Sequence, residues 1–145
     1  MNNREYVIFK LADESYAVDI DHVENIEKHI EITRVPYTKK YIKGVINLRG
    51  NIIPVIDVRK RFNLKEKEAD KDSRIMIINH GELKVGLLVD VSSEVLQIED
   101  VNIEPAPKVT GADDDYISSI GKDNGRIIMI VDLNKLLEIE EFEDL

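Results

Sequence analysis

Two aspartates, Asp57 and Asp132, are the residues of this 145-residue sequence best placed to do chemistry, because each ends an apolar run that occurs twice. The two stretches read IIPVIDVRKRF (Ile52–Phe62) and, 75 positions later, IIMIVDLNKLL (Ile127–Leu137). Two carboxyl groups supplied by two similar halves could perform acid–base hydrolysis. The Asp-Thr/Ser-Gly neighbourhood of an acid-pair protease is missing, so two helix N-caps are the better interpretation.

The other residues with chemical potential form no coherent set. His22, His29 and His80 have no metal-ligand spacing and are expected at exposed or turn positions. Asp113–Asp115 could meet a hard cation, but the alternating acids and central glycine of a calcium loop are absent. The sequence therefore predicts no enzyme, no metal and no cofactor, and it assigns function to surfaces.

A repeat surrounds the two aspartates and predicts the organisation of the chain. The turn Arg49-Gly50-Asn51 falls on Asn124-Gly125-Arg126, and Asn-Gly between apolar runs is a strong hairpin signal. Further upstream, Glu5–Ile26 resembles Arg74–Val95, which lies 69 positions later. Because both offsets occur in the same order, the chain is expected to consist of two similar halves of roughly 70 residues.

Short runs rich in valine and isoleucine predict an all-β protein of small closed barrels. The barrel halves are expected at about 12–68 and 69–137, with possible strand exchange, a joint at Lys65–Asp72 and an acidic tail at 138–145. Short helices should follow Asp57 and Asp132, the second running from Leu133 to about Ile139. The expected strands are Tyr6–Leu11, Tyr16–Ile20, Glu24–Lys28, Ile32–Val35, Val45–Leu48, Ile52–Ile56, Ile75–Asn79, Lys84–Val89, Glu94–Gln97 and Ile127–Val131.

Composition limits the remaining choices. There is no cysteine, no secretory signal and no apolar run long enough to span a membrane, which suits a reducing cytoplasm. The net charge is −9, yet Thr33–Lys67 holds ten Lys/Arg against two acids. This separation either forms solvated faces or steers protein partners. Nucleic acid is a poor candidate, because the basic residues are not interleaved with aromatics.

The stretch GVINLRGNIIPVIDVRKRF resembles the CheW family of bacterial chemotaxis, with YAVDIDHVENI before it and GRIIMIVDLNKLL after it. The resemblance runs from about Glu5 to Leu137, and the chain has no room for a kinase or receiver domain. It implies two SH3-like five-stranded barrels packed on a shared core. It also implies an adaptor, monomeric on its own, that couples the cytoplasmic tip of chemoreceptors to the regulatory domain of the kinase CheA. Such an adaptor would lie in receptor arrays at the inner face of the membrane.

The same resemblance assigns site residues position by position. Receptor binding is implied for Val23, Asn25, Gly44, Arg49 and Val95, and a ring contact with the kinase for Val109. Asn25 stands where some members carry a glutamate able to pair with the arginine, so Arg49 is either freer for a partner or paired elsewhere. An internal role stays open for three of them: Arg49 could hold its own loop, Val109 could pack on its own barrel, and Gly44 could serve the backbone.

Besides the acid-pair hydrolase that would use Asp57 and Asp132, two alternatives to the chemotaxis adaptor stay open. The first is a CheW-like adaptor of a non-flagellar sensory system. The second is a nucleic-acid-binding pair of small barrels that uses Thr33–Lys67. The sequence does not distinguish which receptors are bound, how contacts divide between the barrels, or what the acidic tail does.

Overall fold

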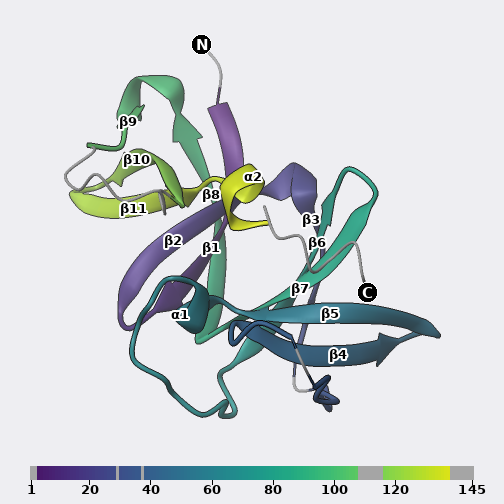
Figure 1. Cartoon of the computed structure of the whole chain (residues 1–145). Coiled ribbons are helices and arrows are strands. Elements are labelled where there is room, and N and C mark those ends of the chain that lie inside the picture. The colour runs from purple at the N-terminus through teal and green to yellow at the C-terminus, as the bar shows by residue number, and fades with distance from the viewer. Residues whose placement is uncertain (1–2, 29, 37, 108–115, 138–145) are drawn as a thin grey trace.

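The computed structural model describes residues 3–28, 30–36, 38–107 and 116–137, and most of them lie in strands (Figure 1). The all-β class predicted from the sequence is confirmed. The strands are β1 (Asn3–Leu11), β2 (Glu14–Asp19), β3 (Val23–Glu27), β4 (Ile42–Leu48), β5 (Asn51–Asp57), β6 (Arg74–His80), β7 (Leu83–Val89), β8 (Val91–Glu99), β9 (Ile103–Pro105), β10 (Ile117–Asp123) and β11 (Arg126–Val131). The helical turns are η1 (Ile20–His22), α1 (Val58–Arg61), η2 (Asp100–Asn102) and α2 (Leu133–Leu136).

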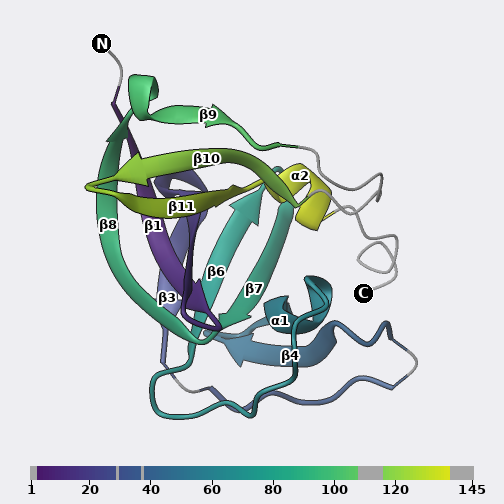
Figure 2. The same ribbon diagram turned by 90° about the vertical axis from the view of Figure 1, so that its left-hand side faces the viewer.

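The strands form two sheets, and each sheet combines strands of the first repeat with strands of the second. Sheet A has six strands in the order β8-β1-β2-β11-β10-β9, and sheet B has five in the order β3-β6-β7-β5-β4. The hairpin β1–β2 of the first repeat lies between β8 and β11 of the second. Reciprocally, the hairpin β6–β7 of the second repeat lies between β3 and β5 of the first (Figures 1 and 2).

The two repeats therefore exchange their first hairpins, and neither sheet coincides with one of the halves 12–68 and 69–137. Each sheet has two junctions between repeats, one parallel (β11 with β2, β5 with β7) and one antiparallel (β8 with β1, β3 with β6). All pairs within a repeat are antiparallel. A parallel pair needs a long connection between its strands. Between β2 and β11 the chain passes through the whole of sheet B, and between β5 and β7 it passes through α1 and β6.

Some predicted elements are wrong in detail. Ile32–Val35 is no strand, since only Thr33 pairs, through an isolated bridge to Val45. Two strands were missed, because β9 has only three residues and β10 reads ISSIGKD, where serines and a glycine interrupt the apolar pattern. The helix α2 ends at Leu136, short of Ile139, which lies outside the described residues.

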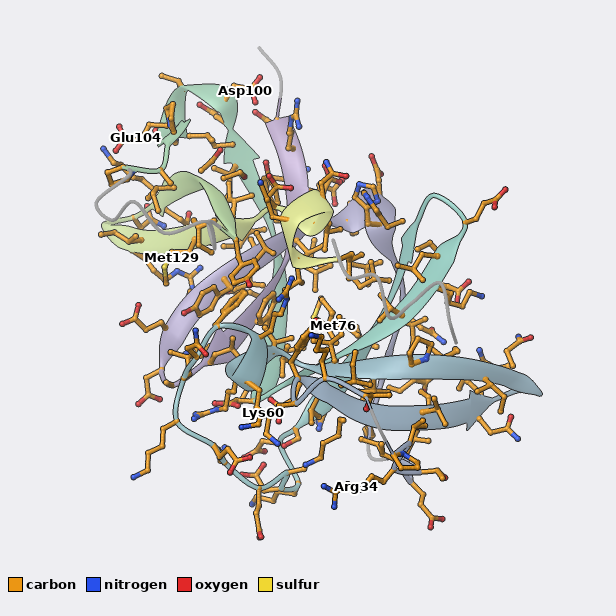
Figure 3. The ribbon with its side chains drawn as sticks, in the orientation of Figure 1. Arg34, Lys60, Met76, Asp100, Glu104 and Met129 are labelled. Carbon is orange, nitrogen blue, oxygen red and sulfur yellow. The ribbon has the colours of Figure 1, made fainter. Side chains whose placement is uncertain are left out.

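The main core lies between the sheets and is shared by them. It joins Phe9 and Val18 of sheet A with Met76 and Leu87 of sheet B, and Leu136 of α2 closes it. Figure 3 shows Met76 in the interior where the two sheets meet. A smaller buried cluster fills each sheet on its own. Neither sheet therefore has an independent core of the size that usually stabilises a domain.

Arg61 joins the two repeats at their contact. Its guanidinium lies 4.5 Å from the ring centre of Tyr41 and 4.8 Å from that of Tyr116, two tyrosines that are 75 positions apart. The same group donates to the carbonyl oxygens of Leu136 (3.3 Å) and Lys135 (3.4 Å), at the end of α2. A cation between two rings and at a helix C-terminus is favourable on both counts.

Replacing Arg61 with methionine should lower the free energy of unfolding by about 1–2 kcal/mol, because the cation–π and carbonyl contacts are lost while the apolar stem remains. Urea denaturation measures the change. Arg61→Lys is the control, since it keeps the charge but not the planar fork, and it should restore less than half of the loss. An Arg61→Met variant as stable as the wild type would show that this contact contributes nothing.

Candidate functional site

The arginine of the β4–β5 turn meets β3. Arg49 adopts a left-handed conformation (φ 52°) and its Nη2 lies 3.7 Å from Oε1 of Glu27. The same Glu27 oxygen accepts a hydrogen bond of 2.8 Å from Nδ2 of Asn25. The Arg49 side chain remains 71% exposed, so the pair is weak and most of the guanidinium faces solvent. The partner of Arg49 inside the chain is thus Glu27. The sequence did not indicate this pair, because β3 and β4 are the opposite edge strands of sheet B and meet only through the curvature of the sheet.

Gly44 supports this cluster through the backbone. Its φ of +153° and its position against Thr33 leave no room for a side chain. A Cβ at Gly44 would overlap the Thr33 carbonyl oxygen, and Thr33 exchanges two hydrogen bonds of 2.8 Å with Val45. The structure gives Gly44 a backbone requirement whether or not it also contacts a receptor.

The other predicted contact residues are distributed over both sheets. Val23 begins β3, is half-buried and packs against the main core. Val95 lies on β8 of sheet A, opposite Val7, and is 51% exposed. The cluster around Arg49 therefore does not include Val95. Val109 lies outside the described residues.

Four of the five large apolar side chains that are exposed among the described residues form two pairs of equivalent positions, and the fifth is Val101. Ile52 and Ile127 are 75 positions apart, and they are 65% and 63% exposed. Ile26 and Val95 are 69 positions apart, and they are 42% and 51% exposed. Because they are exposed at matching positions of the two sheets, these side chains are candidates for protein contacts on each sheet. The sequence repeat could have located these pairs, but only the structure shows that they are exposed.

The two aspartates of the repeat act as N-caps, as predicted. The carboxylate of Asp57 accepts from the Lys60 N–H and that of Asp132 from the Lys135 N–H, each at 3.3 Å. Their own N–H groups donate to the carbonyls of Tyr41 and Tyr116, each at 2.7 Å. These contacts give each carboxylate a structural role in its own repeat, which weakens the case for an acid-pair hydrolase.

Part of the basic segment gathers in one cleft of about 640 Å³. Its cationic side chains are Arg34, Lys39, Lys40, Lys43 and Lys60. Figure 3 shows Lys60 on the outer side of α1 and Arg34 below β4. Lys60 pairs with Glu66 at 2.8 Å, which neutralises one of these charges. The remaining positive charge favours acidic surfaces as partners.

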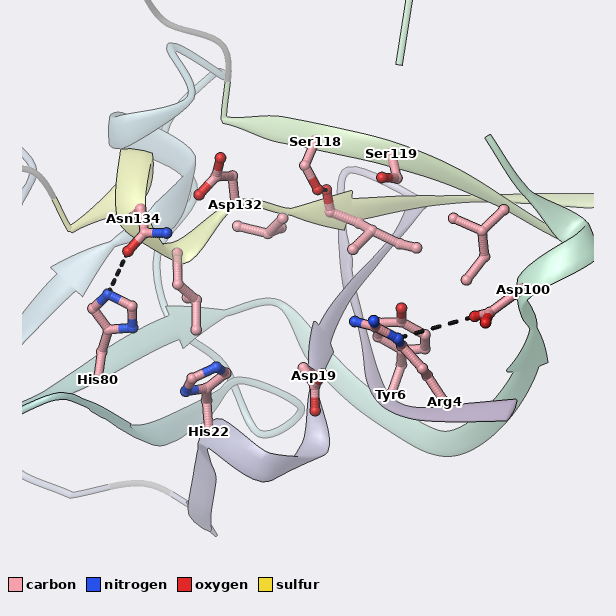
Figure 4. A pocket seen from close by; sticks show the side chains of 14 residues that line it. Arg4, Tyr6, Asp19, His22, His80, Asp100, Ser118, Ser119, Asp132 and Asn134 are labelled. Atoms are coloured by element: carbon pink, nitrogen blue, oxygen red, sulfur yellow. Dashed lines mark hydrogen bonds and ion pairs between the residues drawn. The ribbon is translucent and has the colours of Figure 1, made fainter. Parts of the chain in front are cut away.

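A second, polar cleft of about 580 Å³ is lined by residues of β1, η1, β6, β10 and α2 (Figure 4). His22 and His80 both line it, and their ring centres are 5.5 Å apart. The two histidines lie at turns as predicted, since His22 ends the helical turn η1 and His80 ends β6 at its hairpin, but neither is fully exposed, because both side chains are half-buried. Residues 58 positions apart give no local signal, so the contact follows only from the pairing of β3, which directly follows η1, with β6. No group of three or more His, Cys, Asp or Glu side chains that could hold a metal ion occurs among the described residues, this cleft included.

Nor does any helix of the described residues have the length and apolar character needed to cross a membrane.

Comparison with known proteins defines the class. Residues 5–141 match the family model described as CheW-like domain. The chain is 41% identical to the chemotaxis protein CheW of Bacillus subtilis over 135 residues, covering 92% of this chain and 86% of that protein. It is 39% identical to the chemotaxis protein CheW of Klebsiella aerogenes, covering 95% and 84%. The protein therefore belongs to the CheW-like domain family.

Structural similarity agrees with this assignment. The crystal structure of the scaffolding protein TtCheW from Thermoanaerobacter tengcongensis superposes with a TM-score of 0.88 at 42% identity, covering 96% of this chain and 95% of that chain. A more distant similarity, 23% over 137 residues, extends to the chemotaxis protein CheA of Borreliella burgdorferi, of which the match covers 15%. A CheW-like region is thus present in both kinds of protein.

Proposed function

We propose that this protein is a non-enzymatic scaffold that couples chemoreceptors to the histidine kinase CheA in bacterial chemotaxis. The observation that carries the proposal is the match of nearly the whole chain to chemotaxis proteins named CheW, in sequence and in fold. The similarity of this chain to part of a CheA supports pairing between homologous barrels. The adaptor would act at the inner face of the membrane, within arrays of receptors and kinase.

The paired apolar positions support a bridging role. A protein with one exposed apolar surface on each sheet can contact two homologous barrels at once, which a ring of alternating subunits requires. We assign Ile52 and Ile127 to these surfaces. Each contact would be weak alone, in the micromolar range, and the array would gain strength from many simultaneous contacts.

We assign the cluster around Arg49 to the receptor. An exposed guanidinium on a rigid turn can bind a partner carboxylate through two hydrogen bonds. Asn25 and Val23 lie along β3 beside it, and an amphipathic helix of the receptor tip is the expected ligand.

Calorimetry with the regulatory domain of the cognate CheA tests the kinase surface. Wild-type protein should show saturable micromolar binding, and Ile52→Asp combined with Ile127→Asp should weaken it by at least about tenfold, because a carboxylate would be buried in an apolar contact. Arg49→Ala should bind the kinase domain like the wild type. Absence of wild-type binding would remove the kinase as a partner of this protein.

A receptor-tip fragment tests the assignment of Arg49. Arg49→Ala should weaken receptor binding by at least about fivefold, with little change in melting temperature. Glu27→Gln is the matched variant, since it removes the internal partner and leaves the guanidinium in place. If both variants weaken binding equally, Arg49 acts by holding its own loop and does not contact the receptor.

A further inference from the structure

The two half-buried histidines of the polar cleft come from different repeats. His22 ends η1, directly before β3, and His80 ends β6. Their ring centres lie 5.5 Å apart at an interplanar angle of 55°. Figure 4 shows the His80 ring between Asn134 of α2 and the His22 ring. Neither histidine is used by the adaptor surfaces described above.

The hydrogen bonds of each neutral imidazole ring leave its other nitrogen unprotonated, with a free lone pair. Nδ1 of His22 lies 3.1 Å from the main-chain oxygen of Asn79, which can only accept, so Nδ1 carries the proton and Nε2 keeps its lone pair. Nε2 of His80 lies 2.7 Å from Oδ1 of Asn134 and donates to it. Nδ1 of His80 is then an acceptor, and it is buried without a hydrogen-bond partner among the described residues.

A buried acceptor without a partner is costly and asks for an explanation. Metal-binding histidines show this same pattern, in which one ring nitrogen donates to a carbonyl or amide oxygen and the other holds the ion. Two imidazoles that bind one tetrahedral zinc ion at about 2.0–2.1 Å bring their ring centres to roughly 5–5.5 Å. The observed separation of 5.5 Å agrees with that geometry.

We propose that His22 and His80 together bind one divalent transition-metal ion, such as Zn²⁺ or Ni²⁺. The ligands are Nε2 of His22 and Nδ1 of His80, and imidazole nitrogen suits both ions. No third His, Cys, Asp or Glu completes a cluster within the part of the chain that the structure describes. Water therefore fills the other positions, and Asp19 and Asp132, which line the same cleft, supply negative charge nearby.

The bound ion would tie three elements together. His22 is adjacent to Val23 at the start of β3, His80 belongs to β6, and Asn134 orients His80 from α2. Because Nδ1 of His80 is covered, one imidazole ring must turn as the ion enters, and this terminal torsion is soft. The inference does not depend on the adaptor function.

Titration of tag-free protein with ZnCl₂ or NiCl₂ in a calorimeter tests the proposal. One ion per chain should bind, and saturating metal should raise the melting temperature by several degrees. His22→Ala and His80→Ala should each weaken binding by at least about tenfold, and Asn134→Ala, which leaves both ligands in place, by about tenfold. The variants are compared at equal folded fraction, judged by circular dichroism.

His29 provides the matched control, since it is the third histidine of the chain. His29→Ala should bind metal like the wild type. Absence of saturable binding by the wild type would overturn the proposal. It would also fail if His29→Ala lost the ion, or if His22→Ala and His80→Ala kept it, because the ion would then be held elsewhere.

Discussion

Replacing Gly44 with alanine should lower the melting temperature by about 10 °C, which corresponds to a loss of about 3–4 kcal/mol of unfolding free energy. The φ of +153° is unfavourable for any residue with a Cβ. The new Cβ would also overlap the Thr33 carbonyl oxygen and lie 2.8 Å from its carbon, and these are backbone atoms that cannot turn away. Relief would require breaking the bridge between Thr33 and Val45.

Gly50→Ala is the control that separates the cost of the positive φ from the cost of the steric overlap with Thr33. Gly50 also has a positive φ, of +86°, but a Cβ there meets no atom within 4 Å. Its substitution should cost only about 1 kcal/mol, from backbone strain. Equal melting temperatures for the two variants would refute the overlap at Gly44. Loss of receptor binding by a Gly44 variant would be expected from this loss of stability alone.

Replacing Asp90 with alanine should lower the free energy of unfolding by about 3 kcal/mol at neutral pH. Asp90 accepts from Arg59 at 2.8 Å (Nε to Oδ1) and 2.6 Å (Nη2 to Oδ2), and from the Ala12 N–H at 3.0 Å. Both charged side chains are nearly buried, at 13% and 14% exposure. The substitution would leave the Arg59 guanidinium with only the Lys65 carbonyl oxygen as acceptor, at 2.7 Å, and the Ala12 N–H without its acceptor. It would also disconnect the β1–β2 turn from α1.

The same carboxylate gives the stability a defined pH dependence. Burial on its own raises the pKa of Asp90, but the hydrogen bonds from Arg59 and from the Ala12 N–H outweigh it, so the pKa lies below its usual value. The stabilisation is therefore complete above the pKa of the unfolded chain, about 3.9. It is lost as the pH falls through the lower pKa of the folded state.

Urea denaturation at pH 7 and at steps below pH 4 would measure both effects. Asp21, the residue 69 positions before Asp90, is exposed and offers a matched control in the other repeat. Asp21→Ala should change the stability at pH 7 by less than about 0.5 kcal/mol. If the wild type and Asp90→Ala lost stability in parallel below pH 4, the assignment of this pH dependence to Asp90 would be wrong.

Local features could be predicted from the sequence because neighbouring residues determine them. The hairpin turn at Asn124-Gly125 and the caps at Asp57 and Asp132 depend on a few consecutive side chains, and the structure has them where expected. The repeat also predicted that corresponding elements occur twice. Apolar runs identified most strands, but they failed at Ile32–Val35, where only one residue pairs.

Contacts between distant residues could not be predicted in the same way. The pairing of Arg49 with Glu27, of Arg59 with Asp90 and of His22 with His80 depends on the path of the chain through two sheets. Hydrophobic periodicity does not report the path of the chain, because it shows which face of a strand is buried and not which strand lies beside it. The family resemblance supplied the positions of Val23, Asn25, Gly44, Arg49 and Val95, whose partner contacts remain predictions.

The exchanged hairpins have a consequence for the origin of the molecule. If the segment 65–72 were cut, neither fragment would contain all the strands of either sheet, so the two pieces could fold only with each other. This is the topology of a domain-swapped homodimer whose subunits have become one polypeptide. A symmetric ancestor would have offered the same surface twice to identical neighbours. Duplication and fusion of its gene free the two copies to diverge, and one small protein can then hold two different partners.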